Sequence, residues 1–281
     1  MNPHAIWPPQ VVTSFPLFFP LWPAISRLQA SAFPDLPDWN RALLEQAPIL
    51  VASGKPLRFV PQETGKLGFE TQYEPRCYLQ GEVQTRQDNW HDCFNALAWL
   101  TFPLSKAAIN YRHYQSLSAS EINTEGKSGS ERGKVRDAVT LLDESGVIVA
   151  CSDPELLELL QQFEWKKLFW LKRERVLASM QFYVIGHGLY EKSMQPYLGM
   201  TGQGLLLKVD PAFFTLQLSA RLQQLDHRVA DYVKVPSHCN STREWQPVPL
   251  LGYPGWSEQN RLEAYYDNTA YFRSSRRASK G

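Results

Sequence analysis

The 281-residue chain contains little cysteine, and its cysteines form no pairing pattern. Cys77, Cys93, Cys151 and Cys239 are widely spaced, and none belongs to a CxxC motif. Structural zinc ribbons and dithiol redox sites need closely spaced cysteine pairs. A chain of this length can also bury a large core without disulfides. We therefore expect four buried, reduced thiols.

The sequence also lacks the motifs of the common catalytic families. It has no GxSxG nucleophile motif, no GxxxxGK[ST] phosphate loop and no HExxH zinc motif. Charge of one sign is not in surplus either, because 29 Lys and Arg residues balance 28 Asp and Glu. Such a chain does not indicate nucleic acid or a membrane surface as its main partner. Basic residues cluster only in the C-terminal stretch 273–281, which we interpret as a disordered tail.

Long apolar runs are missing as well. No uninterrupted stretch approaches the roughly 18 residues that indicate a transmembrane helix. The apolar and aromatic N-terminal segment, residues 1–37, has five prolines between positions 8 and 23, and no basic residue precedes its apolar part. We therefore expect neither a signal peptide nor a membrane span there. We predict an extended segment packed on the domain, in a cytoplasmic protein.

Helix patterns occur at several places in the rest of the chain. Residues 38–46 are predicted to form a short helix that is capped by Asp38, and the helices at 88–101 and 104–115 are separated by Pro103. The clearest helix is predicted at 211–233, where apolar residues recur every three or four positions.

Strand patterns are shorter. They occur at 57–80, 181–185 and 205–210, and the stretch 136–151 predicts a β-hairpin that turns at Glu144-Ser145-Gly146. Residues 117–131 are rich in Ser and Gly, which indicates a flexible loop. Because strands and helices do not alternate regularly, we predict an α+β fold. Its helices and short antiparallel strands would form one compact domain, residues 38–272.

The predicted helix that follows Asp88 carries a polar face. Asp88, His91, Asp92 and Asn95 fall within a narrow arc at 100° per residue, together with Trp99. The positive end of the helix dipole favours a neutral imidazole at His91, which is the form that a general base or metal ligand needs. The alternative stays open that the face is merely solvated and that Asp88 only caps the helix.

Two further groups of polar residues accompany this face. On the predicted hairpin, Asp137 and Asp143 share one strand face and could hold a hard cation, although Asp143 and Glu144 are also ordinary turn residues. Farther along, His187 and Glu191 are four residues apart and could share a ligand if their segment is helical. The glycines beside His187 allow a close approach of the backbone, and a plain glycine turn is the alternative.

The residues of these groups resemble a known sequence family. Residues Asp88 to Leu97 with Trp99 to Pro103 are similar to the NWHDxFNALxWLxFP signature of an uncharacterised proteobacterial family with a domain of unknown function. The stretches 136–146, 186–192 and 251–256 are similar to it too, so the resemblance spans about residues 70 to 273. It implies a cytoplasmic bacterial protein, and it implies no activity, cofactor or catalytic residue.

These patterns predict an enzyme that carries out metal-assisted hydrolysis or a related transfer on a small-molecule substrate. A divalent metal ion is the expected cofactor. The alternatives are a non-catalytic module that binds a ligand or partner, and an RNA-directed protein. The sequence leaves the oligomeric state open. The predicted catalytic residues are His91, Asp92, Asn95, Asp137 and Glu191; the predicted metal ligands are His91, Asp137 and His187; the predicted substrate-binding residues are Asp88, Trp90, Trp99, Arg136, Tyr190 and Trp256.

Overall fold

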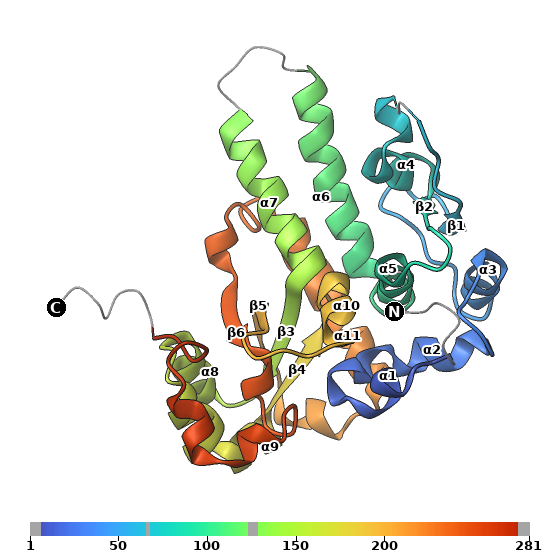
Figure 1. The fold of residues 1–281 in the computed structure, drawn as a ribbon. Helices are drawn as coiled ribbons and strands as arrows, with labels where there is room; N and C mark the ends of the chain where they lie inside the picture. The colour runs from blue at the N-terminus through green and yellow to red at the C-terminus, as the bar shows by residue number, and fades with distance from the viewer. Residues whose placement is uncertain (1–6, 66–67, 123–128, 275–281) are drawn as a thin grey trace.

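A four-stranded mixed sheet forms the centre of the molecule in the computed structural model, which describes residues 7–65, 68–122 and 129–274 (Figure 1). The strand order is β4-β3-β5-β6. β3 pairs antiparallel with β4 and parallel with β5, and β5 pairs antiparallel with β6. The strands are β3 (Gly146–Cys151), β4 (Met180–Val184), β5 (Thr201–Lys208) and β6 (Gln246–Pro249).

Strand β3 separates two apolar cores. All six of its residues are buried, as expected for a strand that is covered on both faces. Because successive side chains point to opposite faces, Val147 and Val149 join one core, and Ile148 and Ala150 join the other. The first core includes α5 (Trp90–Thr101) and α10 (His187–Ser193); the second includes α6 (Pro103–Ile122), α7 (Gly129–Ser145) and α11 (Leu218–Lys234). The fold is α+β, as predicted.

The predicted hairpin at 136–151 is wrong in its first half. Helix α7 continues to Ser145, and only the second half forms a strand. Val135, Val139 and Leu142 recur at helical spacing and pack into the second core. Burial of this apolar stripe therefore outweighs the local turn pattern around the glycine.

The flexible loop predicted at 117–131 is also wrong at both ends. Helix α6 extends to Ile122, and α7 begins at Gly129, whereas residues 123–128 lie outside the described part of the chain. The two helices run side by side as a long pair (Figure 1). Pro103 starts α6 instead of merely ending the previous helix, because the first helical position needs no backbone N–H donor.

The N-terminal segment is helical where we predicted an extended chain. Its helices are α1 (Gln10–Ser14), a 3₁₀ helix at Pro16–Leu21 and α2 (Trp22–Leu28). The helix predicted at 38–46 is confirmed as α3 (Leu36–Leu44), but its cap is Asp35, and Asp38 is the third helical residue of the capping box. Pro16, Pro23 and Pro37 stand in the first two positions of their helices, where proline is tolerated. The segment contributes to the first core, since Phe18 is fully buried, with its ring centroid 5.8 Å from that of Phe94 and 5.6 Å from that of Tyr190.

This packing predicts a large effect of truncating Phe18. Phe18→Ala is expected to lower the free energy of unfolding by about 3–5 kcal/mol, because it leaves a cavity in a buried aromatic cluster. Urea denaturation followed by circular dichroism would measure the change. Leu44→Ala is the control, because that side chain is 86% exposed, and its effect should stay within about 0.5 kcal/mol. Equal effects of the two substitutions would contradict a structural role of this segment.

Smaller elements complete the fold. β1 (Arg58–Val60) and β2 (Glu82–Gln84) form a parallel pair beside α4 (Tyr73–Gln80), so most of the strand pattern predicted at 57–80 is wrong. Asp153 caps α8 (Pro154–Gln161), because its side chain accepts a hydrogen bond from the backbone nitrogen of Glu155, and α9 (Arg173–Ser179) leads into β4. The long C-terminal helix begins at Leu218, after a 3₁₀ turn at Pro211–Thr215.

The state of the cysteines and the character of the helices bear on two further predictions. All four cysteines are buried and free of disulfides, as predicted. Within the described ranges, none of the helices combines the length and the apolar character that crossing a bilayer would require.

Candidate metal centre

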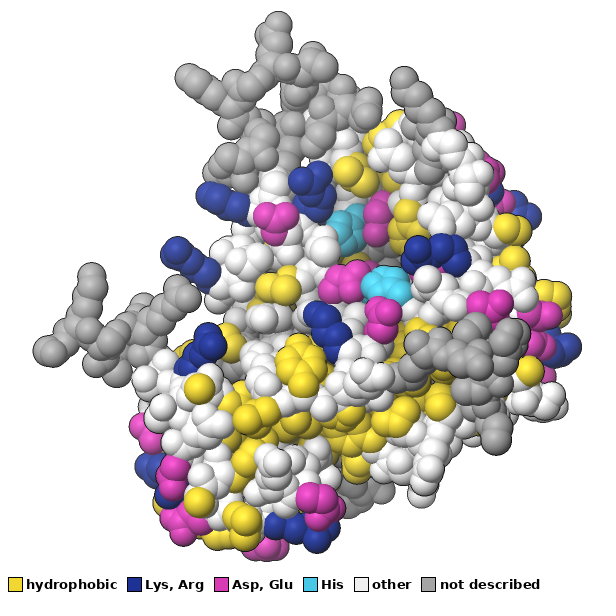
Figure 2. All heavy atoms as spheres, in the orientation of Figure 1, with side chains coloured by type: hydrophobic (Ala, Val, Ile, Leu, Met, Phe, Trp, Pro, Cys, Tyr) yellow, Lys and Arg dark blue, Asp and Glu magenta, His cyan; other side chains and the backbone are white. Residues whose placement is uncertain are grey.

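Three helix ends meet at one cleft. Helix α10 packs against both α5 and α7. His91 lies in the first turn of α5, His187 is the first residue of α10, and Glu144 lies in the last turn of α7. The packing of α10 on the other two helices brings these three side chains together. In the surface view, histidine and acidic side chains gather in a hollow near the middle of this face (Figure 2).

The nitrogen and oxygen atoms of these residues are close enough to share an ion. One ligand atom from each of His91, Glu144 and His187 lies within 4.8 Å of the others. The Nε2 atoms of the two histidines are 3.1 Å apart. Oε1 of Glu144 lies 3.7 Å from Nε2 of His91 and 3.4 Å from Nε2 of His187. Two imidazole nitrogens bound to one tetrahedral zinc ion at its usual bond length lie roughly 3.3 Å apart. The observed spacing matches a shared ion.

A carboxylate stands behind each imidazole ring. Nδ1 of His91 is 3.0 Å from Oε2 of Glu191, which is a hydrogen-bond distance, whereas Nδ1 of His187 is 3.7 Å from Oδ2 of Asp143 and has no hydrogen-bond partner among the described residues. The acceptor beside Nδ1 of His91 favours the tautomer of this ring that carries its proton on Nδ1 and leaves the Nε2 lone pair available. Two lone pairs 3.1 Å apart repel each other unless a cation or a proton lies between them. The arrangement is therefore suited to a cation.

Burial and neighbouring charges set the protonation of this cluster. Burial lowers the pKa of His187 to about 3, against the opposing effect of Asp143, so its ring is neutral at physiological pH. Burial would raise the pKa of Asp143, but Lys106 and His187 together outweigh it and lower the value to about 2. Burial raises the pKa of Glu144, with His91 opposing the shift. Neutral imidazole and ionised carboxylate are the forms that bind a metal ion.

Glycine allows the helices to approach this closely. A Cβ atom at Gly188 would lie 2.3 Å from Oε2 of Glu144 and 3.0 Å from its backbone oxygen. At Gly186, a Cβ atom would lie 2.5 Å from the backbone nitrogens of Ser145 and Gly146. The glycines beside His187 thus seat α10 against the end of α7, where the sequence had suggested a close approach to a ligand.

The cleft beside the histidines has a volume of about 280 Å³ and a strongly polar wall. Tyr73 and Glu74 come from α4 and were missed because their segment was predicted to be a strand. Lys106, which reaches Asp143 from α6, was missed too, because only its buried position reveals its role. The lining residues are Gln62, Tyr73, Glu74, Gln84, Arg86, His91, Asp92, Asn95, Asp143, Glu144 and His187.

Five of the predicted site residues meet here. His91, Asp92, Asn95 and His187 line the cleft, and Glu191 contacts His91. The carboxylate of Asp92 is engaged by Arg86, with Nε–Oδ2 and terminal N–Oδ1 distances of 2.9 and 2.8 Å. Asp92 thus anchors Arg86 at the cleft wall.

Other predicted site residues are not brought to the cleft. Arg136 and Asp137 are exposed on α7, and Asp137 lies two turns before Glu144. Asp88 is exposed, and α5 is capped by Asn89, whose side chain accepts a hydrogen bond from the backbone of Asp92. The predicted cap at Asp88 is therefore wrong.

The four aromatic residues that were predicted to bind substrate are absent from the cleft lining. Trp90 stacks on Trp7, with ring centroids 5.9 Å apart. Trp99, Tyr190 and Trp256 are each no more than 5% exposed and belong to the core. Because α5 is buried on nearly all sides from Cys93 to Leu100, its polar arc did not indicate which residues reach solvent.

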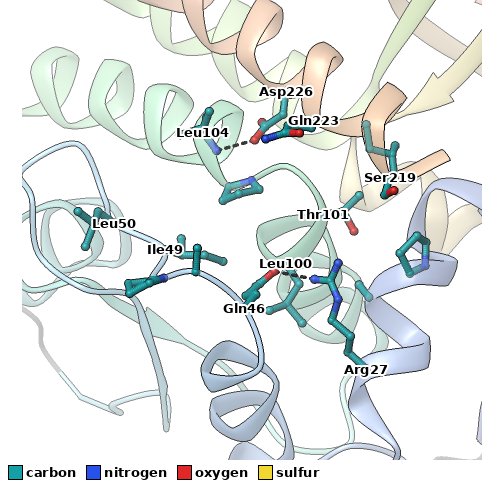
Figure 3. Close-up of a pocket in the computed structure, with 16 residues that line it drawn as sticks. Arg27, Gln46, Ile49, Leu50, Leu100, Thr101, Leu104, Ser219, Gln223 and Asp226 are labelled. Carbon is teal, nitrogen blue, oxygen red and sulfur yellow. Dashed lines mark hydrogen bonds between the residues drawn. The ribbon is translucent and has the colours of Figure 1, made fainter. Parts of the chain in front are cut away.

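A larger recess of about 530 Å³ lies between the N-terminal helices and α11 (Figure 3). Its wall is mostly apolar, and its polar groups are largely paired. Arg27 donates to Gln46 at 2.6 Å, and Asp226 accepts from the backbone nitrogens of Leu104 and Ser105 at the start of α6. The recess contains none of the three candidate ligands, so the smaller cleft is the candidate site.

Comparison with known proteins gives a family without an assigned activity. A family model described as "Protein of unknown function (DUF3025)" matches residues 57–276. The matched range includes α5, α7 and α10, and therefore all three candidate ligands, whereas the N-terminal helices precede it. No curated protein and no solved structure matched the chain.

Proposed function

The chain belongs to the DUF3025 family of proteins of unknown function, and we propose that it binds one divalent transition-metal ion through His91, Glu144 and His187. One observation supports this most strongly: the two Nε2 atoms are 3.1 Å apart, a carboxylate oxygen of Glu144 lies within 3.7 Å of both, and Nδ1 of His91 is hydrogen-bonded to Glu191. Two histidines and one carboxylate are a ligand set of catalytic zinc sites and of non-haem iron sites. Asp143 and Glu191 act through the histidines and are positioning residues.

We propose metal-assisted hydrolysis as the reaction of this site. Three protein ligands leave a coordination position for water or substrate, which distinguishes catalytic from structural zinc sites. A bound ion supplies Lewis acidity and lowers the pKa of water. The side chains of His91 and Glu144 are 33% and 39% exposed, so the site is open to a substrate from solvent. The wall of the cleft then selects which substrate enters.

Metal content tests the proposal directly. The purified, untagged protein, dialysed against Zn²⁺ or Fe²⁺ and then against buffer, should retain close to one ion per chain by elemental analysis. His91→Ala and His187→Ala should each lose it, because two remaining ligands hold an ion weakly. His227→Ala is the matched control, since that histidine is exposed on α11. Retention of the ion by both site variants, or no retention by the wild type, would contradict the metal centre.

A further inference from the structure

The amide of Asn95 presents an unexplained polar group in the cleft. Asn95 lies one turn after His91 on α5, lines the cleft and is only 6% exposed. Its Nδ2 donates to the phenolic oxygen of Tyr73 at 2.6 Å, but its Oδ1 has no hydrogen-bond partner among the described residues. An unpaired buried acceptor costs about 1–3 kcal/mol of stability. Natural proteins rarely retain such a cost unless the group serves a purpose.

Tyr73 supplies the complementary group. Its phenolic oxygen accepts from Asn95, and burial raises the pKa of the phenol well above its usual value, so the proton stays on the oxygen. No hydrogen bond from this hydroxyl to an acceptor occurs in the described part of the chain. An acceptor and a donor that lack partners among the described residues therefore stand next to each other, on two residues that line the cleft. If the Asn95 amide is rotated by half a turn, the Tyr73 hydroxyl donates to Oδ1 of Asn95. Nδ2 of Asn95 is then the donor and the Tyr73 oxygen the acceptor, so the pair still presents one donor beside one acceptor.

The cationic side chains at the cleft and behind it are bound by carboxylates, and the Glu74 carboxyl group in the lining accepts a hydrogen bond from Asn110. Arg86 is bound by Asp92, and Lys106 by Asp143. The cleft is also small, at about 280 Å³, and its wall includes the side-chain amide of Gln62, whereas the amide of Gln84 is bonded to the backbone of Glu63 and Thr71. These features favour a small, polar, uncharged compound over an anion or a long apolar chain.

We infer that Asn95 and Tyr73 bind a carbonyl and an N–H on one side of a ligand, and that the substrate of the metal site is a small amide of this kind, such as a lactam or cyclic ureide. Oδ1 of Asn95 accepts from the ligand N–H, and the Tyr73 hydroxyl donates to the ligand carbonyl. This inference rests on the proposed hydrolysis. In that reaction, the oxygen of water bonds to the carbonyl carbon and the C–N bond breaks. The nitrogen takes up a proton from water, so the ring opens to a single product without oxidation or reduction: a lactam gives an amino acid, and a cyclic ureide gives a carboxylic acid that carries a urea group.

Two matched probes test the recognition without requiring turnover. Binding of 2-pyrrolidinone and of N-methyl-2-pyrrolidinone to the metal-loaded protein would be measured by ligand-observed NMR titration. The N-methyl compound has no N–H and leaves Oδ1 of Asn95 unpaired, so it should bind at least about tenfold more weakly. Equal affinity for the two probes, or no binding of 2-pyrrolidinone, would overturn the inference.

A double variant separates recognition from folding and from metal binding. Asn95→Leu with Tyr73→Phe removes both polar partners while keeping similar side-chain volumes, so the thermal midpoint should be unchanged or higher. The same protein should keep its metal ion and lose the preference for 2-pyrrolidinone. Tyr78→Phe, on the same helix but outside the cleft lining, should leave the preference unchanged.

The outcomes distinguish this inference from the proposed function. A double variant that keeps both its metal and its preference for 2-pyrrolidinone overturns the role of Asn95 and Tyr73 and leaves the metal centre standing. A wild-type protein that prefers 2-pyrrolidinone but retains no metal ion contradicts the metal centre and supports the recognition pair. Marked unfolding of the double variant would make the pair structural, and the inference would fail.

Discussion

Replacing Lys106 by Met is expected to lower the free energy of unfolding by about 3–5 kcal/mol. The side chain of Lys106 is only 3% exposed, and its ammonium group forms an ion pair with Asp143, whose side chain is 14% exposed. The ammonium also lies 5.7 Å from the ring centre of Trp99. Methionine keeps much of the volume but leaves the Asp143 carboxylate buried without its cation. An uncompensated buried charge is among the most destabilising single defects.

Urea denaturation of the wild type, Lys106→Met and the double variant Lys106→Met with Asp143→Leu measures this effect. The double variant should recover most of the lost stability, because removing both charges also removes their desolvation cost. Asp143→Leu alone should be destabilised, since it leaves the ammonium unpaired. If Lys106→Met were as stable as the wild type, groups other than Lys106 would stabilise the buried carboxylate of Asp143. That result would contradict the role given to the ion pair.

Replacing Gly188 by Ala is expected to weaken metal binding at least about tenfold while leaving the fold intact. The new methyl group would lie 2.3 Å from Oε2 of Glu144, so this carboxylate must move away from the two histidines. Gly188 lies within α10, where alanine has a better helix propensity than glycine by about 1 kcal/mol. The propensity gain helps to offset the local crowding, so the effect should appear chiefly in metal affinity.

The matched control is Gly133→Ala on α7. Gly133 is also helical, but a Cβ atom there would meet no other atom within 4 Å. Isothermal titration of the metal-free proteins with Zn²⁺ should show a weakened Gly188→Ala and an unchanged Gly133→Ala, and thermal unfolding should show both variants folded. Unchanged zinc affinity in Gly188→Ala would mean that Glu144 is not a ligand.

Much of the local structure at the site followed from periodicity. The 3.6-residue repeat places His91, Asp92 and Asn95 on one side of α5, and the same repeat places His187 and Glu191 one turn apart on α10. These relations hold inside a single helix, so no distant contact is needed to establish them. The sequence also indicates His91 and His187 as candidate metal ligands, and the structure brings these two side chains together.

The meeting of these helices could not be read from any local pattern. Residues 136–145 form a helix because their apolar stripe packs into the second core, and that helix carries Glu144 to the histidines and leaves Asp137 exposed two turns away. Trp99 lies in the polar arc of α5, yet it is buried because other elements enclose this helix on nearly every side. Periodicity specifies which side chains share a face, whereas the packing of cores and the clearance at Gly186 and Gly188 decide which faces meet.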